Sequence, residues 1–187
     1  MPYYHGSPQG GLTVLRPQLS EHGKPYVYFT INPIVAALYT VRPVDKPFHW
    51  YPYGFTEKGT PVYTEYYPHA AEDIYRGKVG YLYSCQKIDH LSSPIAIQDT
   101  YVTNTPQPVD RCVVLEDVYL QLLEYERMGE LMIQRFEQLT SEQRRSIVQI
   151  VDSEIQKYHL KETPDCSYSI FLQSRFPTLW TDCKTQP

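Results

Sequence analysis

The stretch from residue 25 to residue 39 constrains the fold most, because its character changes at a single dipeptide. Residues 26–31 are aromatic and β-branched, which predicts a strand. Asn32 and Pro33 then predict the start of a helix, because an asparagine side chain caps an amide of the first turn and proline has no amide to leave unpaired. Small and apolar residues follow. The stretch therefore predicts a strand that turns sharply into a helix.

Two tyrosines mark this corner. Tyr28 lies near the end of the expected strand, and Tyr39 follows eleven residues later in the expected helix. Since a helix rises only about 1.5 Å per residue, it can carry Tyr39 back alongside the strand. Both rings can then face one slot, which suits a flat aromatic ligand. The chain has 18 tyrosines against 6 phenylalanines, an excess that fits either half-buried structural positions or an aromatic-lined cleft.

Length and charge limit the class of protein. A chain of 187 residues can form one domain with a proper core. A net charge of −4 argues against nucleic acid as the partner, because binding to phosphates needs a basic surface. No apolar run approaches the roughly 20 residues that span a bilayer, so we expect no membrane partner.

Cysteine usage and the first residues predict the compartment. The four cysteines are far apart and form no CxxC pair, which favours reduced thiols and argues against a zinc site. Strand-like sequence begins at Tyr3, without the charged start and apolar core of a secretory signal. We therefore expect a cytoplasmic protein.

Strand signals dominate the first two thirds of the chain. Beyond residues 26–31, strands are expected over residues 2–7, 79–85, 95–103 and 110–118. Residues 43–68 combine five prolines with many aromatic residues. Prolines at this density forbid a long helix, and disordered segments are poor in aromatics. This segment is therefore expected to be an ordered, irregular excursion that carries a short strand or hairpin.

Helical spacing takes over after Tyr119. Apolar residues predict one helix over residues 122–139, with a break at Gly129. Thr140 and Gln143 form a capping box that predicts a second helix, which stops before residue 164. The tail over residues 163–187 is apolar enough for part of it to dock. Strands followed by helices predict an α+β fold.

The candidates for chemistry near the N-terminus are His5, Ser7, Tyr28 and Tyr39. A histidine beside a glycine can donate from one ring nitrogen while its backbone approaches a ligand closely. Taken singly, a lone histidine is more often structural, and a lone tyrosine is more often a core residue. Their combination is what indicates a function.

That combination resembles the ADP-ribosyltransferase superfamily. Residues 4–7 (Tyr-His-Gly-Ser) look like its first strand motif, and residues 27–30 with 36–39 look like the second motif of the diphtheria-toxin-like branch. That branch includes the poly-ADP-ribose polymerases, whose strand and helix tyrosines have the same spacing, and the small rifamycin-modifying ADP-ribosyltransferases. Residues 80–83 and 100–117 are similar to later strands of the rifamycin-modifying group.

The resemblance covers roughly residues 3–118. It implies a fold of split antiparallel sheets, with an NAD-binding domain over residues 1–118 and a helical extension over residues 119–187 packed on it.

The resemblance also implies roles for five residues. His5 would hydrogen-bond the adenosine-side ribose of NAD with the help of Ser7, and the Gly6 backbone would hold the nicotinamide amide. Tyr28 and Tyr39 would sandwich the nicotinamide ring. In the family the nicotinamide leaves, an oxocarbenium-like ribose forms and an acceptor attacks it. Such a transition state needs negative charge beside the ribose.

The family usually supplies this charge with a glutamate at the start of a later strand, and here the sequence departs from the pattern. Thr100 occupies the matching position, preceded by Gln98 and Asp99. Asp99 or Gln98 could substitute if the register slips, and Asp89 is a third candidate, since the rifamycin-modifying relatives place an aspartate in the corresponding loop. Asp99 is equally well explained as a solvent-facing turn residue.

Three functions remain open at this point. The leading expectation is an NAD-dependent mono-ADP-ribosyltransferase, or an NAD glycohydrolase, with NAD as substrate, a protein or small molecule as acceptor and no metal. The second is a catalytically silent relative that binds NAD or a nucleotide, or acts in protein interaction. The third is an RNA 2′-phosphotransferase, which would need Arg16, Arg42 or Arg76 gathered at the slot and which the acidic pI disfavours.

Overall fold

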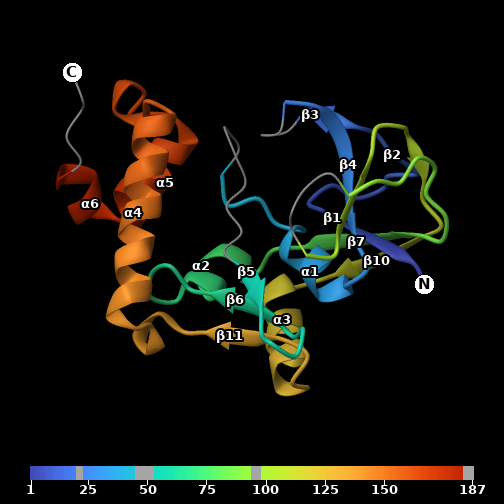
Figure 1. The fold of residues 1–187 in the computed structure, drawn as a ribbon, viewed down its shortest axis with the longest axis horizontal. Helices are drawn as coiled ribbons and strands as arrows, with labels where there is room; N and C mark the ends of the chain where they lie inside the picture. Colours follow the sequence, from blue (N-terminus) through green and yellow to red (C-terminus); the bar gives the residue numbers. More distant parts are fainter. Residues whose placement is uncertain (20–22, 45–52, 94–97, 183–187) are drawn as a thin grey trace.

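The computed structural model describes residues 1–19, 23–44, 53–93 and 98–182, and it has an α+β fold (Figure 1). Its strands are β1 (Tyr3–Ser7), β2 (Val14–Leu15), β3 (Gln18–Leu19), β4 (Pro25–Thr30), β5 (Tyr53–Phe55), β6 (Pro61–Thr64), β7 (Gly80–Cys85), β8 (Thr100–Thr103), β9 (Gln107–Pro108), β10 (Arg111–Leu115) and β11 (Met132–Gln134). Its α-helices are α1 (Pro33–Leu38), α2 (Ala70–Tyr75), α3 (Val118–Arg127), α4 (Ser141–Lys157), α5 (Ser167–Arg175) and α6 (Pro177–Asp182), and the short 3₁₀ helices are η1 (Phe136–Gln138) and η2 (Leu160–Glu162).

The main sheet contains the two N-terminal motifs. Its strand order is β10-β7-β1-β4-β3, and β8 also pairs with β4. The pairs β10–β7, β7–β1, β1–β4 and β4–β8 are all antiparallel. Helix α1 packs on one face of this sheet, and a cluster built around Phe29 and Tyr83 fills the other. The α+β class predicted from the order of strand and helix signals is confirmed.

The β4–α1 corner forms as its sequence predicts. The Asn32 side chain accepts hydrogen bonds from the amides of Ile34 and Val35, and Pro33 occupies the first turn. All residues of α1 from Ile34 to Leu38 are buried. A helix this short is stabilised mainly by packing rather than by propensity, so the corner is fixed by its cap and by the sheet beneath it.

The excursion over residues 43–68 carries the expected hairpin, β5–β6. Residues 45–52 of the excursion lie outside the described part of the chain. Residues 95–97 of the expected strand over 95–103 are likewise outside it, and the regular strand in the described remainder is β8. A third strand, β11, joins β6 in parallel and completes a small second sheet.

The helix expected over residues 122–139 is wrong in its second half. Helix α3 ends at Arg127, and Gly129 has φ +75°, a conformation that glycine adopts without strain. The chain then becomes strand β11, in which Ile133 is buried while Met132 is half exposed. Apolar residues that suggested a helical stripe instead alternate across a strand, because pairing with β6 satisfies this backbone.

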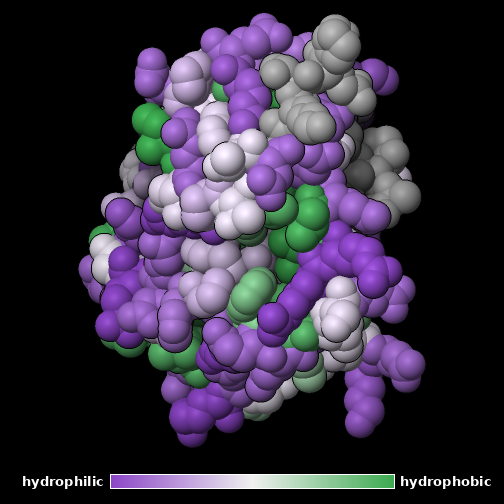
Figure 2. Space-filling view, turned by 90° about the vertical axis from the view of Figure 1, so that its left-hand side faces the viewer, coloured by the Kyte–Doolittle hydropathy of each residue, from purple (hydrophilic) through white to green (hydrophobic). Residues whose placement is uncertain are grey.

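The C-terminal helices α4–α6, at the left of Figure 1, pack in a second hydrophobic cluster that also includes Tyr67 and Ala70. The capping box of Thr140 and Gln143 opens α4 as predicted. Ile147, Val151 and Ile155 are buried, whereas Ile150, expected on the same stripe, is 37% exposed. Figure 2 shows the outer side of this region as largely hydrophilic.

The described part of the tail, up to residue 182, docks as expected. Phe171, Leu172 and Phe176 are buried beside Tyr67, and Arg175 makes an ion pair of 2.8 Å with Asp73 of α2. Residues after the expected boundary at 118 also join the hydrophobic cluster around α1, which includes Leu122 and Ile133. No helix among the described residues has the length and apolar character needed to cross a membrane.

Candidate functional site

Strand β1 has two unlike edges. With β7 it pairs over five residues, from Tyr3 opposite Cys85 to Ser7 opposite Tyr81. With β4 it pairs at one residue, Tyr4 opposite Thr30. Beyond Tyr4 the ladder between β1 and β4 is not continued, so the sheet opens beside Gly6. We call this opening, bounded by Gly6 and Tyr28, the β1–β4 split.

Backbone groups of both strands are directed toward the split. The amide and carbonyl of Val102 in β8 bond to Ser92, at 2.8 and 2.9 Å, and therefore point away from β4. Opposite residues of an antiparallel pair either both face each other or both face away, so Tyr28, opposite Val102, directs its backbone groups away from β8 and toward β1. By the same alternation Thr30 and Tyr4 face each other, and Gly6, two residues on, directs its amide and carbonyl toward β4.

The His5 side chain bridges the split. Its Nδ1 lies 2.9 Å from the carbonyl oxygen of Tyr28. A carbonyl oxygen only accepts, so Nδ1 carries the proton and donates it, and in the neutral ring Nε2 keeps a lone pair. Burial lowers the pKa of His5, the bond to Tyr28 partly opposes this, and the Arg42 charge lowers it further. The ring is therefore neutral at pH 7, and its Nε2 can accept a hydrogen bond from a hydroxyl group.

Gly6 is needed for packing as well as for its backbone groups. A Cβ built there would lie 1.9 Å from the carbonyl oxygen of Ala36 in α1. Helix α1 therefore rests directly on β1 at this residue. Any larger side chain would push the helix away from the split.

The two tyrosines and the histidine belong to different faces of the sheet. Paired residues share a face, so Tyr28, Thr30 and Gly6 lie on the side covered by α1. His5 lies on the opposite side, with its ring centroid 6.0 Å from that of Phe29. The expected slot is thus not a single-sided pocket. The two faces adjoin at the split, where the His5 side chain bonds to the Tyr28 backbone.

Tyr39 ends α1 and is held by a partner that the sequence did not single out. The Tyr39 hydroxyl donates to the Tyr53 hydroxyl at 3.3 Å, and the two rings meet edge to face. Tyr28 meets Tyr26 in the same way. Tyr53 belongs to the aromatic excursion, so its residue type was visible, but no local pattern tied it to Tyr39. Ser7 is buried and accepts a bond from the amide of Gln9.

The candidate carboxylate Asp99 lies at the start of β8. Thr100, which follows it, pairs with Thr30, so Asp99 is next to the end of β4 that leads into α1. Its φ is +55° and its side chain is half-buried. Val102, opposite Tyr28, is three residues further on, about 10 Å along the strand. Gln98 is exposed, and its carbonyl accepts from Thr100.

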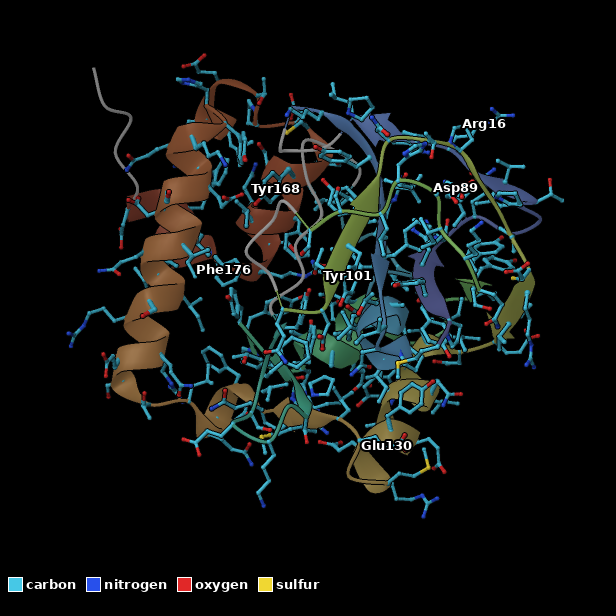
Figure 3. All side chains as sticks on the ribbon, turned by 45° about the vertical axis from the view of Figure 1, so that its right-hand side comes forward. Arg16, Asp89, Tyr101, Glu130, Tyr168 and Phe176 are labelled. Atoms are coloured by element: carbon cyan, nitrogen blue, oxygen red, sulfur yellow. The ribbon has the colours of Figure 1, made fainter. Side chains whose placement is uncertain are left out.

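Asp89 lies at the other end of β8. Its carbonyl accepts from Thr103 Oγ1 at 2.7 Å, and its amide donates to Gln107 Oε1 at 3.1 Å. These bonds hold the backbone and leave the carboxylate exposed. In Figure 3 Asp89 lies among the upper loops near Arg16, whereas Tyr101 lies near the middle of the molecule. Asp89 and Asp99 are therefore next to opposite ends of β8.

Of the three arginines considered from the sequence, Arg42 is the one whose charge reaches His5. Arg16 is exposed beside β2, and Arg76 forms an ion pair with Glu72 and lies over the Tyr119 ring. The arginine cluster that a phosphotransferase needs is not assembled from the described residues. Within those residues there is likewise no group of three or more His, Cys, Asp or Glu side chains placed to hold a metal ion.

Comparison of the chain with protein-family models, with curated proteins and with solved structures finds no match.

Proposed function

We propose that the protein binds NAD across the β1–β4 split and acts as an NAD-dependent mono-ADP-ribosyltransferase or NAD glycohydrolase. The observation that carries this proposal is the opening of the sheet at Gly6, bridged by His5. An amide and a carbonyl directed from one residue match the carbonyl and amino groups of a carboxamide, which is what nicotinamide offers. Tyr28 and Tyr39 supply aromatic surface for the ring.

His5 supports the ribose end of the same ligand. A neutral imidazole with Nδ1 already donating to Tyr28 has one remaining function, acceptance at Nε2. Ribose hydroxyls are donors of the right kind. Because His5 and Tyr28 belong to opposite faces, a long dinucleotide that passes through the split can contact both. Arg42 adds positive charge near His5, which favours a ligand that carries a diphosphate.

In the proposed reaction the bond between ribose C1′ and the nicotinamide nitrogen breaks. Its electron pair leaves with nicotinamide, positive charge develops on the ribose, and an acceptor oxygen or water attacks C1′ and loses a proton. Asp99 is the candidate to stabilise that charge, since it is half-buried and stands beside the position that Thr100 occupies.

A second candidate function is NAD binding without turnover. Thr100 stands at the start of β8 and cannot stabilise a cation as a carboxylate does. The charged group that acts on His5 is also a cation rather than a carboxylate. Both observations are what a sensor or interaction protein that binds NAD without turnover would show.

Calorimetric titration with NAD tests the proposal. We expect the wild type to bind, and His5→Ala and Tyr39→Ala each to lose at least about tenfold in affinity, or about 1.4 kcal/mol. His90→Ala is the matched control, because His90 is an exposed loop histidine. A folded wild type that binds no NAD would refute the proposal.

Release of nicotinamide then separates the two functions. Turnover that falls at least about a hundredfold in Asp99→Asn, with NAD affinity kept, is the result expected of the enzyme. If the wild type binds NAD and releases no nicotinamide, the second candidate function, NAD binding without turnover, is the one supported.

A further inference from the structure

Strand β10 is the end strand of the main sheet and pairs only with β7 among the described residues. A strand that packs on one face buries alternate side chains. In β10 four successive residues, Arg111 to Val114, are all exposed. Val113 is 38% exposed and Val114 is 45% exposed. Both faces of this strand are therefore accessible, as is its outer edge.

The outer edge offers backbone groups for pairing. The Asp110 amide donates to the Ser84 carbonyl of β7 at 3.0 Å. Ser84 therefore faces β10, and Arg111, which lies opposite it, faces β7. By alternation, Cys112 and Val114 direct their amides and carbonyls away from β7. An apolar edge with a row of outward donors and acceptors is a template for another strand, and proteins usually block such edges with charge or proline.

An apolar patch continues from this edge onto one face of the sheet. Val114 lies opposite Tyr81, and Val79, two residues before Tyr81, shares its face. Val79 is 42% exposed and Tyr81 is half-buried. The patch lies beside the outer edge, so a strand added there would cover part of it.

We propose that β10 pairs antiparallel with β10 of a second copy of this chain, about a twofold axis at Val114. The inference is independent of the proposed NAD site. It continues the main sheet across the axis and buries Val114 of each copy against the other.

The charges of the strand select this register. Residues that face each other must both point outward or both inward, so the axis passes through a residue. An axis at Val113 would place Asp110 opposite Glu116, two like charges. An axis at Val114 places Arg111 opposite Asp117, Val113 opposite Leu115 and Val114 opposite itself. Opposite charges then meet at both ends of an apolar centre.

An axis at Cys112 is also less favourable, because it would set Asp110 opposite Val114 and Arg111 opposite Val113. The Val114 register sets Cys112 opposite Glu116, but of the three it is the one that pairs Arg111 with an acidic residue and keeps the apolar residues 113–115 together. A short strand pairing buries less than the roughly 1,600 Å² of a standard interface, so we expect a weak dimer with a Kd of about 10–100 μM.

Sedimentation velocity across this concentration range tests the dimer. Val114→Lys places two like charges against each other at the axis and should weaken dimerisation at least about tenfold. Val148→Lys is the control, because Val148 is 41% exposed on α4, far along the chain from β10. A wild type that stays monomeric throughout, or a dimer that Val114→Lys leaves unchanged, would overturn the proposal.

Oxidative crosslinking tests the register. In a Cys112→Ser background, Val114→Cys brings two thiols into a hydrogen-bonded pair with Cα atoms about 5.5 Å apart, within disulfide reach. Val113→Cys faces Leu115 instead and should not crosslink. Crosslinking at residue 114 and not at 113 is the expected result. Crosslinking at residue 113 alone would overturn the register, and crosslinking at neither would overturn the pairing.

Discussion

The two edges of β1 differ although they belong to the same five residues. The β7 edge is a continuous antiparallel ladder over all five. The β4 edge is a ladder at Tyr4 only, and beyond it one side chain, His5, spans the gap to Tyr28. One edge of the strand therefore stabilises the sheet, and the other leaves a backbone and an imidazole available to a ligand.

The difference between the two edges of β1 gives a reason why the motif at residues 4–7 combines a histidine with a glycine. The glycine lets α1 approach β1 so closely that no Cβ fits, and the histidine holds β4 where the ladder stops. Ligand groups can replace missing ladder bonds only if the strands are kept apart at a fixed distance. In this protein the His5 bridge ties β4 to β1 beside the split.

Gly6→Ala should have the largest effect on this arrangement. Its Cβ would lie 1.9 Å from the Ala36 carbonyl, so helix or strand must move. We expect a loss of about 3 kcal/mol or more in the free energy of unfolding, measured with urea. Gly54→Ala is the control, because nothing lies within 4 Å of its Cβ and its φ is not positive. Equal losses in both variants would show that close packing of α1 on β1 is not the cause.

Tyr83→Phe should lower the free energy of unfolding by an intermediate amount, because Tyr83 of β7 bonds to the segment that follows β1. The buried Tyr83 hydroxyl donates to the Gln9 carbonyl at 2.8 Å and accepts from the Leu12 amide at 3.2 Å. Its loss leaves both groups without this partner, at a cost of about 1–3 kcal/mol. Tyr81→Phe, on the same strand, is the control. NAD affinity should be nearly unchanged, and a large loss of affinity would contradict the division between the two edges.

The pH dependence of stability should show the smallest effect. Burial lowers the pKa of His5 below that of the unfolded chain, so the unfolded state binds the proton more readily. Stability should therefore fall as pH drops below about 6.5. His5→Gln removes this contribution, so the stability difference between wild type and variant should shrink between about pH 7 and pH 5. A difference that grows on acidification would mean that His5 is protonated in the folded state.

Local signals predicted the corner and the caps well. Asn32 and Pro33 start α1, and Thr140 and Gln143 start α4, as expected. Long-range pairing was harder to predict. The apolar residues near Ile133 fit a helix by spacing, and only β6, about seventy residues earlier, makes them a strand. Helix α2, which starts without a side-chain cap, gave no comparable signal.

For the site, the sequence determined which residues are present and the local turn that separates Tyr28 from Tyr39. A cap and a proline act on the backbone within a few residues, so they need no distant partner. The tertiary structure decided that β1 and β4 part after Tyr4, that His5 donates from Nδ1, and that Asp99 and Asp89 lie at opposite ends of β8. These properties depend on which distant strand satisfies each backbone group, and residue spacing along the chain does not contain that information.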